Sequence, residues 1–294
     1  MKDPYKLNID RWQTLNFSLE FWLKGKYIYD TPNFLGNISS YLPGQLLLAV
    51  IFYLMGNVGY IQVAAILLFS YAVIKKFKNN FLAVQAIFLL GISLSYIYEA
   101  ICKSDFISSF IFTASFILLW SEKFKDNYFE KPILLGICLG ILCLTRSVVI
   151  VALILFLLKS FLKTDWSARI KMTLSFIITI IILLGTVLFP AKSFQYILDH
   201  NPLNLQGQSN GFVMLFFLTL TIIMSFYVKK ISQVFIYSSI IIFVLMVSFL
   251  LEQYFVLGYD YQNNFFSTTY LASCLPFSIV GYCFSIKDEK INKI

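Results

Sequence analysis

Long apolar runs follow one another along most of this chain, separated by short polar stretches. An α-helix rises 1.5 Å per residue, so about 20 mainly apolar residues cross the roughly 30 Å hydrocarbon core of a bilayer. The runs lie at about 58–74, 81–98, 105–120, 132–145, 147–162, 170–189, 212–228, 234–251 and 267–285. They predict an all-α fold, a polytopic transmembrane helical bundle of about nine spans.

The composition argues against the soluble classes of protein. Hydrophobic residues make up 59% of the 294 residues and charged residues 13%, against roughly 25% charged residues in a soluble domain. The net charge is +8, but the positive residues form short clusters between apolar runs. They therefore predict membrane topology, with lipids as neighbours and no nucleic-acid partner. The five cysteines show no C-x-x-C spacing, so we expect neither a metal site nor a disulfide framework.

Basic residues are shared unevenly between the loops. Clusters of Lys and Arg follow the first, third, fifth, seventh and last runs, whereas the segments 99–104, 190–211 and 252–266 hold at most one each. Basic loops stay cytoplasmic, so every second loop is predicted to lie inside. This orientation predicts a multi-pass protein of the plasma (inner) membrane. Residues 1–57 would form an external amphipathic, juxtamembrane segment ahead of a bundle formed by residues 58–294.

Residues 132–158 test this topology, because they are apolar except for Arg146 near the middle. As one helix they would extend about 40 Å, longer than the hydrocarbon core, with an arginine at its centre. An arginine there costs about 2.5–3.5 kcal/mol on insertion scales. Two short spans with Arg146 at the outer turn avoid both problems, and we expect that arrangement.

The segment "LNIDRWQTLNFSLEFWLKGKYIYD" (7–30) precedes the first span and is too polar to cross a bilayer. Apolar side chains recur in it at helical spacing, at Ile9, Trp12, Leu15, Leu19 and Trp22. This pattern predicts a helix that lies on the membrane surface. An exported start of this kind usually follows a span, so we expect an upstream helix that this sequence lacks; the alternative is a segment translocated unaided.

The stretch "SYLPGQLLLAVIFYLMG" (40–56) is apolar but short for a crossing. Counting it as a span would break the alternation of basic loops. We therefore expect a second surface-lying or shallow re-entrant helix, with Pro43 in its first turn. The alternative is a short, tilted span.

Candidate chemistry lies in "YEAICKSDF", where Glu99 and Asp105 flank Lys103. A carboxylate at the edge of a membrane costs free energy unless it is paired or faces a wet cavity, so both acids are candidates for a functional site. The alternative is structural. Glu99 and Lys103 are four residues apart, and on a helix they would pair with each other.

Two further side chains are candidates for substrate binding. Arg146 at an outer turn has the geometry to bind phosphate through paired hydrogen bonds, although it could instead extend to lipid headgroups. His200 is the only histidine and follows Asp199, but a single histidine beside an acid is a weak signal. A histidine in a surface loop is the alternative.

The segment "GICLG" (136–140) spaces two glycines four residues apart. This spacing lets two helix backbones approach closely. We expect it to serve packing within the bundle and not dimerisation.

The order of these motifs resembles the multi-pass C-type glycosyltransferases, in particular the branch of protein O-mannosyltransferases and lipid A aminoarabinose transferases. In that family an external acidic motif is followed by juxtamembrane helices, a proline-led apolar stretch and a second aspartate. These features correspond here to Asp10 in "IDRW", to "LKGKYIYD", to "LPGQLLLAVIFYLMG" and to Asp105 in "KSDF". The family's basic residue between two short helices corresponds to Arg146 in "CLTRSV". The resemblance covers roughly residues 7–160. It departs at Arg11, where the family typically has a glutamate, and in lacking the family's first helix.

The resemblance implies a membrane enzyme that transfers a sugar from a polyprenyl-phosphate carrier to an unspecified acceptor on the extracytoplasmic face. It implies catalytic roles for Asp10 and Asp105, and we take Glu99, Lys103, Arg146 and His200 as the candidates for substrate binding. Asp10 would take the acceptor's proton, and Arg146 or Lys103 would stabilise the departing lipid phosphate. No cofactor is required, and a divalent metal is compatible with the pattern. The rival interpretations are a transporter subunit and a non-catalytic or truncated multi-pass membrane protein.

Overall fold

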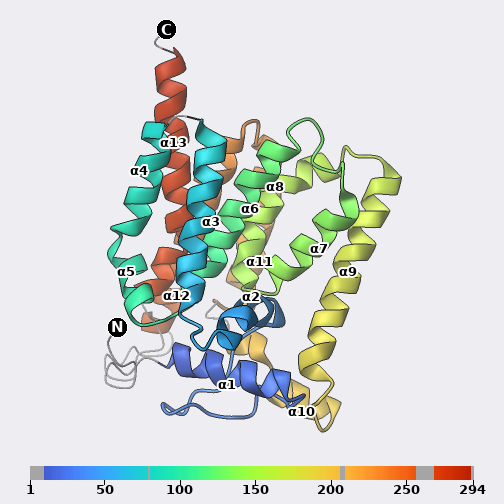
Figure 1. The fold of residues 1–294 in the computed structure, drawn as a ribbon. Coiled ribbons are helices and arrows are strands. Elements are labelled where there is room, and N and C mark those ends of the chain that lie inside the picture. Colours follow the sequence, from blue (N-terminus) through green and yellow to red (C-terminus); the bar gives the residue numbers. More distant parts are fainter. Residues whose placement is uncertain (1–9, 79, 206–208, 256–267, 293–294) are drawn as a thin grey trace.

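The computed structural model describes residues 10–78, 80–205, 209–255 and 268–292, which form an all-helical fold (Figure 1). Within these ranges no β-strand forms, and the one isolated antiparallel bridge joins Pro32 and Ile38 in a loop. The expected all-α fold is therefore confirmed.

Several helices are long and apolar enough to cross a membrane. In the described ranges there are five such segments: α3 (Tyr60–Phe77), α6 (Phe106–Lys123), α9 (Trp166–Leu188), α12 (Ile231–Phe255), and the Thr269–Lys287 segment of η4 (Thr268–Cys274) and α13 (Leu275–Asn292). The helices α4 (Asn80–Gly91) and α5 (Leu94–Ile101) meet at a bend of 58° and form a sixth if they are taken as one broken span. A protein with multiple candidate membrane spans is therefore confirmed.

The other apolar helices are shorter than these spans. They are α2 (Pro43–Leu54), α7 (Pro132–Cys143), η2 with α8 (Ser147–Val149 and Ile150–Phe161), and α11 (Gly211–Tyr227). The expected break near Arg146 is present, because α7 ends at Cys143 and the chain resumes at Ser147. Full crossings are thus indicated for five or six segments, fewer than the nine apolar runs.

The basic loops meet at one end of the bundle, at the top of Figure 1. Lys76 at the end of α3 pairs with Glu122 at the end of α6, with 3.2 Å between nitrogen and oxygen. Lys159 near the end of α8 donates to the carbonyl oxygen of Phe226 near the end of α11. The helices α1 (Arg11–Leu23), α2 and α10 (Phe194–Asp199) lie at the opposite end. The bundle therefore separates a basic end from the end that carries the N-terminal segment.

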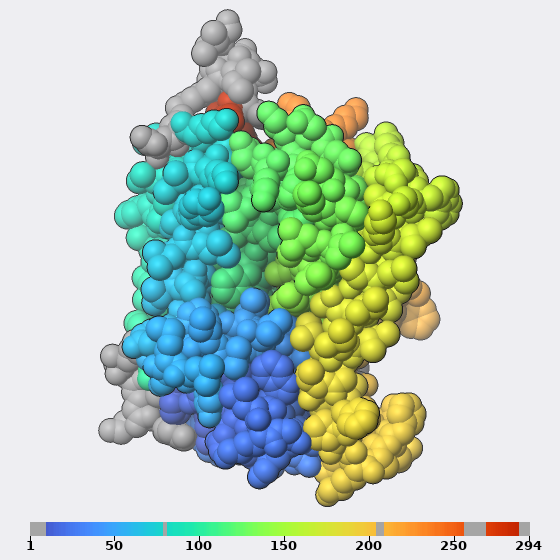
Figure 2. Space-filling model, turned by 45° about the vertical axis from the view of Figure 1, so that its right-hand side comes forward, coloured from blue at the N-terminus to red at the C-terminus, as the bar shows by residue number. Residues whose placement is uncertain are grey.

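The helix α1 runs across this opposite end, roughly perpendicular to the long helices (Figure 1). Leu15 and Leu19 of the apolar stripe are completely buried, and they belong to a cluster of hydrophobic residues drawn mainly from residues 15–61. Trp22 donates a 2.9 Å hydrogen bond to Thr186 of α9. Figure 2 shows the N-terminal segment, in blue, packed against the lower part of α9, in yellow. Other parts of the chain therefore cover the apolar stripe at Leu15 and Leu19, and the position of this helix on the membrane surface stays a prediction. Ile9 lies outside the described residues.

The helix α2 begins at Pro43, as the sequence predicts, and its 12 residues span about 18 Å, too little to cross a bilayer. Its start packs tightly on the end of α7. A Cβ atom at Gly44 would overlap the carbonyl oxygen of Ile141, and the backbone N–H of Gln45 donates to the carbonyl oxygen of Leu144 at 3.2 Å. This close approach positions α2 beside the turn that carries Arg146.

The glycines of "GICLG" lie where α7 crosses α9. A Cβ atom at Gly136 would overlap the Met172 carbonyl oxygen and the Ser175 side chain, and one at Gly140 would come within 2.9 Å of Thr179. The prediction that this motif packs within the bundle is confirmed.

We expect Gly136→Ala to lower the free energy of unfolding by about 1–3 kcal/mol, because backbone atoms of α9 must move to admit the methyl group. The measurement is thermal unfolding in detergent with a thiol-reactive dye, which the chain's own buried or half-buried cysteines would bind on unfolding. Gly185→Ala on α9 is the control, because its Cβ would meet no atom within 4 Å. Equal melting temperatures for wild type and Gly136→Ala would contradict the packing.

Candidate functional site at the end of the bundle

Four charged side chains meet where α1, α5, α6 and the α7–η2 turn come together. They are two cations, Arg11 and Arg146, and two acids, Glu99 and Asp105. Both acids are completely buried, Arg146 is 7% exposed, and the Arg11 side chain is 19% exposed. Buried charges are tolerated only when they are paired and hydrogen-bonded, so the contacts of each group decide what it can do.

Arg11 forms an ion pair with Glu99, with 3.1 Å between Nη1 and Oε1. The second oxygen of Glu99 accepts a hydrogen bond from the backbone N–H of Ile107. The Arg11 guanidinium carbon lies 4.8 Å from the centre of the Phe106 ring. Arg11 is the position at which the chain departs from the glycosyltransferase pattern, and it is the partner of a buried acid. The sequence did not predict this pairing.

The alternative pairing of Glu99 with Lys103 is wrong. The helix α5 ends at Ile101, and Lys103 adopts a left-handed conformation with φ of 55°. The backbone N–H of Ser104 donates back to the carbonyl oxygen of Glu99 at 2.9 Å, which closes the helix end. This turn leaves the Lys103 ammonium 5.3 Å from the centre of the Trp12 ring.

Asp105 is held on both carboxylate oxygens. The hydroxyl of Tyr41 donates to Oδ1 at 2.6 Å, and the amide of Gln45 donates to Oδ2 at 2.8 Å. Burial, and then the negative charge of Asp105, raises the pKa of the Tyr41 phenol well above its usual value, so the phenol stays protonated as a donor at neutral pH. Tyr41 and Gln45, on either side of Pro43, therefore bind Asp105. Nothing in the sequence indicated this role for either residue.

Arg146 occupies the turn between α7 and η2, as expected. Its guanidinium carbon lies 5.1 Å from the centre of the Phe106 ring and 5.7 Å from that of Tyr41. Its Nε is buried and has no hydrogen-bond partner among the described residues. A buried donor without a partner costs about 1–3 kcal/mol. Binding an anion would remove that penalty.

Asp10 lies at the start of α1 and is half-buried. Its Oδ2 accepts hydrogen bonds of 2.8 Å from the side-chain amides of both Asn33 and Asn37. The Tyr41 hydroxyl that donates to Asp105 is also 3.1 Å from the carbonyl oxygen of Arg11, the next residue. The structure therefore brings Asp10 to the edge of the charged cluster that contains Asp105.

His200 lies apart from these contacts. It follows α10, and its ring packs 4.3 Å from that of Tyr196, between ring centres. Its Nδ1 is 3.0 Å from the Tyr196 carbonyl oxygen, and its own carbonyl oxygen is 3.5 Å from the Tyr27 hydroxyl. None of these described contacts joins His200 to the charged cluster, and its role in substrate binding stays a prediction.

The chemistry available at this end of the bundle is that of an oriented carboxylate, Asp10, at the edge of a cluster that holds a buried cation with an unused donor, Arg146. The first can accept a proton, and the second can bind an anion. Among the residues that the structure describes, no three His, Cys, Asp or Glu side chains are grouped so as to hold a metal ion. Comparison of the chain with protein families, curated proteins and solved structures finds no match.

Proposed function

We propose that this chain is a membrane glycosyltransferase similar to the multi-pass C-type enzymes. It would transfer a sugar from a polyprenyl-phosphate carrier to an acceptor at the extracytoplasmic face of the plasma membrane. One observation carries the proposal. A half-buried carboxylate oriented by two amides, Asp10, lies at the edge of a buried cluster in which the Arg146 Nε has no partner among the described residues.

In the proposed reaction Asp10 accepts the proton of an acceptor hydroxyl, whose oxygen forms a bond to the anomeric carbon of the sugar. The bond between that carbon and the phosphate oxygen breaks, and its electron pair leaves with the lipid phosphate. Arg146 stabilises the negative charge that develops there, and Lys103 supplies a second cation near Trp12. Asp105, with both oxygens bonded, holds Tyr41 and Gln45 in position.

The proposed topology has nine crossings. The bent pair α4–α5 counts as one, and α7 and η2–α8 form two short crossings with Arg146 at their outer turn. The ion pair between the ends of α3 and α6, both at the basic end, supports this arrangement. The candidate site then lies outside the cell, where a lipid-linked sugar would approach from the outer leaflet.

The test combines transfer with orientation. Vesicles that contain the purified chain, supplied with polyprenyl-phosphate sugars and candidate acceptors, are expected to form a glycosylated product. In intact cells, a membrane-impermeant thiol reagent is expected to label Leu35→Cys, in the exposed loop beside Asp10. The control Lys125→Cys, at the basic end, should react only after permeabilisation. Labelling in the reverse order would exclude an extracytoplasmic site.

A non-catalytic membrane protein is a second candidate, and one observation favours it. All four carboxylate oxygens of Glu99 and Asp105 already have protein partners. Such a protein would show no transfer with any donor, yet would keep the same orientation in the membrane.

A further inference from the structure

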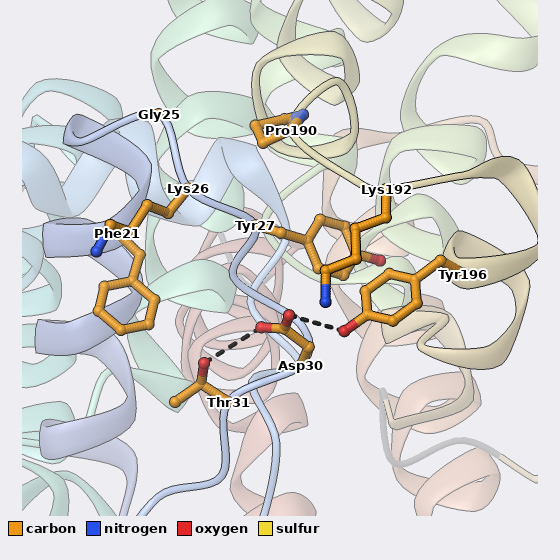
Figure 3. A pocket seen from close by; sticks show the side chains of 9 residues that line it. All are labelled: Phe21, Gly25, Lys26, Tyr27, Asp30, Thr31, Pro190, Lys192 and Tyr196. Atoms are coloured by element: carbon orange, nitrogen blue, oxygen red, sulfur yellow. Dashed lines mark hydrogen bonds between the residues drawn. The ribbon is translucent and has the colours of Figure 1, made fainter.

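A cavity of about 510 Å³ opens at the same end of the bundle, between the loop after α1 and the connection from α9 to α10 (Figure 3). Its volume falls within the range of small-molecule sites, about 300–1,000 Å³. The lining residues are Phe21, Gly25, Lys26, Tyr27, Asp30, Thr31, Pro190, Lys192 and Tyr196. None of them belongs to the cluster around Asp105.

Two segments distant in sequence build this cavity. The hydroxyl of Tyr196 donates a 2.9 Å hydrogen bond to Asp30, 166 residues away, and Thr31 donates to the other oxygen of Asp30 at 3.2 Å. The ring of the buried Tyr27 lies 5.6 Å from that of Tyr196, between centres. Figure 3 shows Asp30 between Thr31 and Tyr196, with both hydrogen bonds converging on it. The arrangement is therefore fixed by tertiary contacts.

The charges of the lining are unbalanced. The ammonium groups of Lys26 and Lys192 lie over the rings of Phe21 and Tyr196, at 5.6 and 5.1 Å from the ring centres. Neither has a salt-bridge partner in the described part of the chain. Asp30 is the only acid in the lining. Figure 3 shows the Lys26 ammonium beside Phe21 and the Lys192 ammonium on the side of Asp30, so Lys192 is the cation on the Asp30 side of the cavity.

Both tyrosines of the lining stay protonated at neutral pH. The hydrogen bond to Asp30, followed by burial, raises the pKa of Tyr196, and burial, followed by the charge of Asp30, raises that of Tyr27. The two rings are therefore neutral aromatic surfaces that carry hydroxyl groups. They add no negative charge to oppose the lysines.

We propose that this cavity binds an anionic saccharide, a sugar that carries a carboxylate or a phosphate. The ring of a sugar has an apolar face that packs on aromatic side chains, here the partly exposed Tyr196. Its hydroxyls donate to Asp30 and to the hydroxyl oxygen of Thr31, and its acidic group meets the Lys192 ammonium. A neutral sugar would leave the Lys192 ammonium without a counter-ion.

This proposal goes beyond sugar transfer and does not depend on it, because it concerns binding alone. The loop at 24–42 nevertheless connects the two sites, since it carries Asp30 at the cavity and, three residues later, Asn33 at Asp10. A saccharide in the cavity would therefore be bound beside the carboxylate to which we assign proton transfer.

The test is equilibrium binding to the full chain in nanodiscs, with glucuronate and glucose 6-phosphate as acidic probes and glucose and inorganic phosphate as controls. We expect saturable binding of an acidic sugar at least tenfold tighter than that of either control. A glycolipid headgroup has the same chemistry as a free sugar. Nanodiscs that contain glucuronosyl diacylglycerol are therefore compared with nanodiscs that contain the glucosyl lipid. The readouts are competition of each lipid with the soluble acidic probe, and the rise in the chain's melting temperature that each lipid causes.

Variants locate the binding site. Lys192→Gln and Asp30→Asn should each weaken binding of the acidic probe at least tenfold, whereas Lys192→Arg should retain most of it. Because Lys192 is exposed, its replacement should not unfold the chain. Lys125→Gln, at the basic end, is the matched control and should bind as wild type. Equal binding of acidic and neutral sugars, or an unchanged affinity in Lys192→Gln, would overturn the proposal, and neither result would bear on the transfer assay.

Discussion

Replacing Asp10 by asparagine is expected to lower the rate of sugar transfer by about 10²–10⁴-fold, the usual contribution of general acid–base catalysis. The substitution keeps the size and shape of the side chain. It removes the group that can accept a proton. It also replaces one of the two acceptor oxygens near Asn33 and Asn37 by an NH₂ group, which donates. The measurement is the initial rate in vesicles with saturating donor, analysed as kcat and KM separately. The loss should fall mainly on kcat, because Asp10 acts on the acceptor's proton.

Two controls make this result specific to Asp10. Asp199→Asn changes an exposed acid at the same end of the bundle and should leave the rate unchanged. The thiol-reactive unfolding assay should give Asp10→Asn a melting temperature close to that of wild type, since this carboxylate is only half-buried. An undiminished rate in a folded Asp10→Asn chain would remove Asp10 from the proposed mechanism.

Breaking the ion pair between Arg11 and Glu99 is expected to have the largest effect on stability. Arg11→Met leaves the completely buried Glu99 without its cation, and loss of one partner of a buried pair typically costs about 3–5 kcal/mol. The methionine retains an apolar contact with the ring of Phe106. The loss should appear as a lowered free energy of unfolding, and as a detached α1 that becomes susceptible to proteases.

A double-mutant cycle separates the pairing from the packing. Glu99→Gln removes the buried charge, so the double variant Arg11→Met, Glu99→Gln should be more stable than Arg11→Met alone. Breaking the exposed pair of Glu20 and Lys24 on the same helix is the control and should give no measurable change. Additive effects of the two single substitutions would show that Arg11 and Glu99 do not stabilise each other.

Features that depend on local pattern could be predicted from the sequence. The apolar runs predict the helices, and a charge in the middle of one run predicts the break at Arg146. Pro43 begins α2, and the glycine spacing of 136–140 predicts a close helix contact. Each of these features has a local cause: the spacing of apolar or small residues, the fixed backbone angle of proline, or the cost of burying a charge. All of these causes act over a few neighbouring residues.

The pairing of charged and polar groups was decided by the tertiary structure alone. Arg11 pairs with Glu99 across 88 positions, and Tyr41 binds Asp105 across 64. Lys103, by contrast, is directed away from Glu99 by a single left-handed residue. The sequence places Lys103 four residues from Glu99 and Arg11 much farther away, and only the packing of α1 across the end of the bundle selects Arg11. The composition and the apolar runs thus determined that the chain is a helical membrane protein. The contacts of Asp10, Arg146 and Asp30 required the folded arrangement. Hydrogen bonds act over about 3 Å in space, and the number of residues between two groups does not give their distance in space.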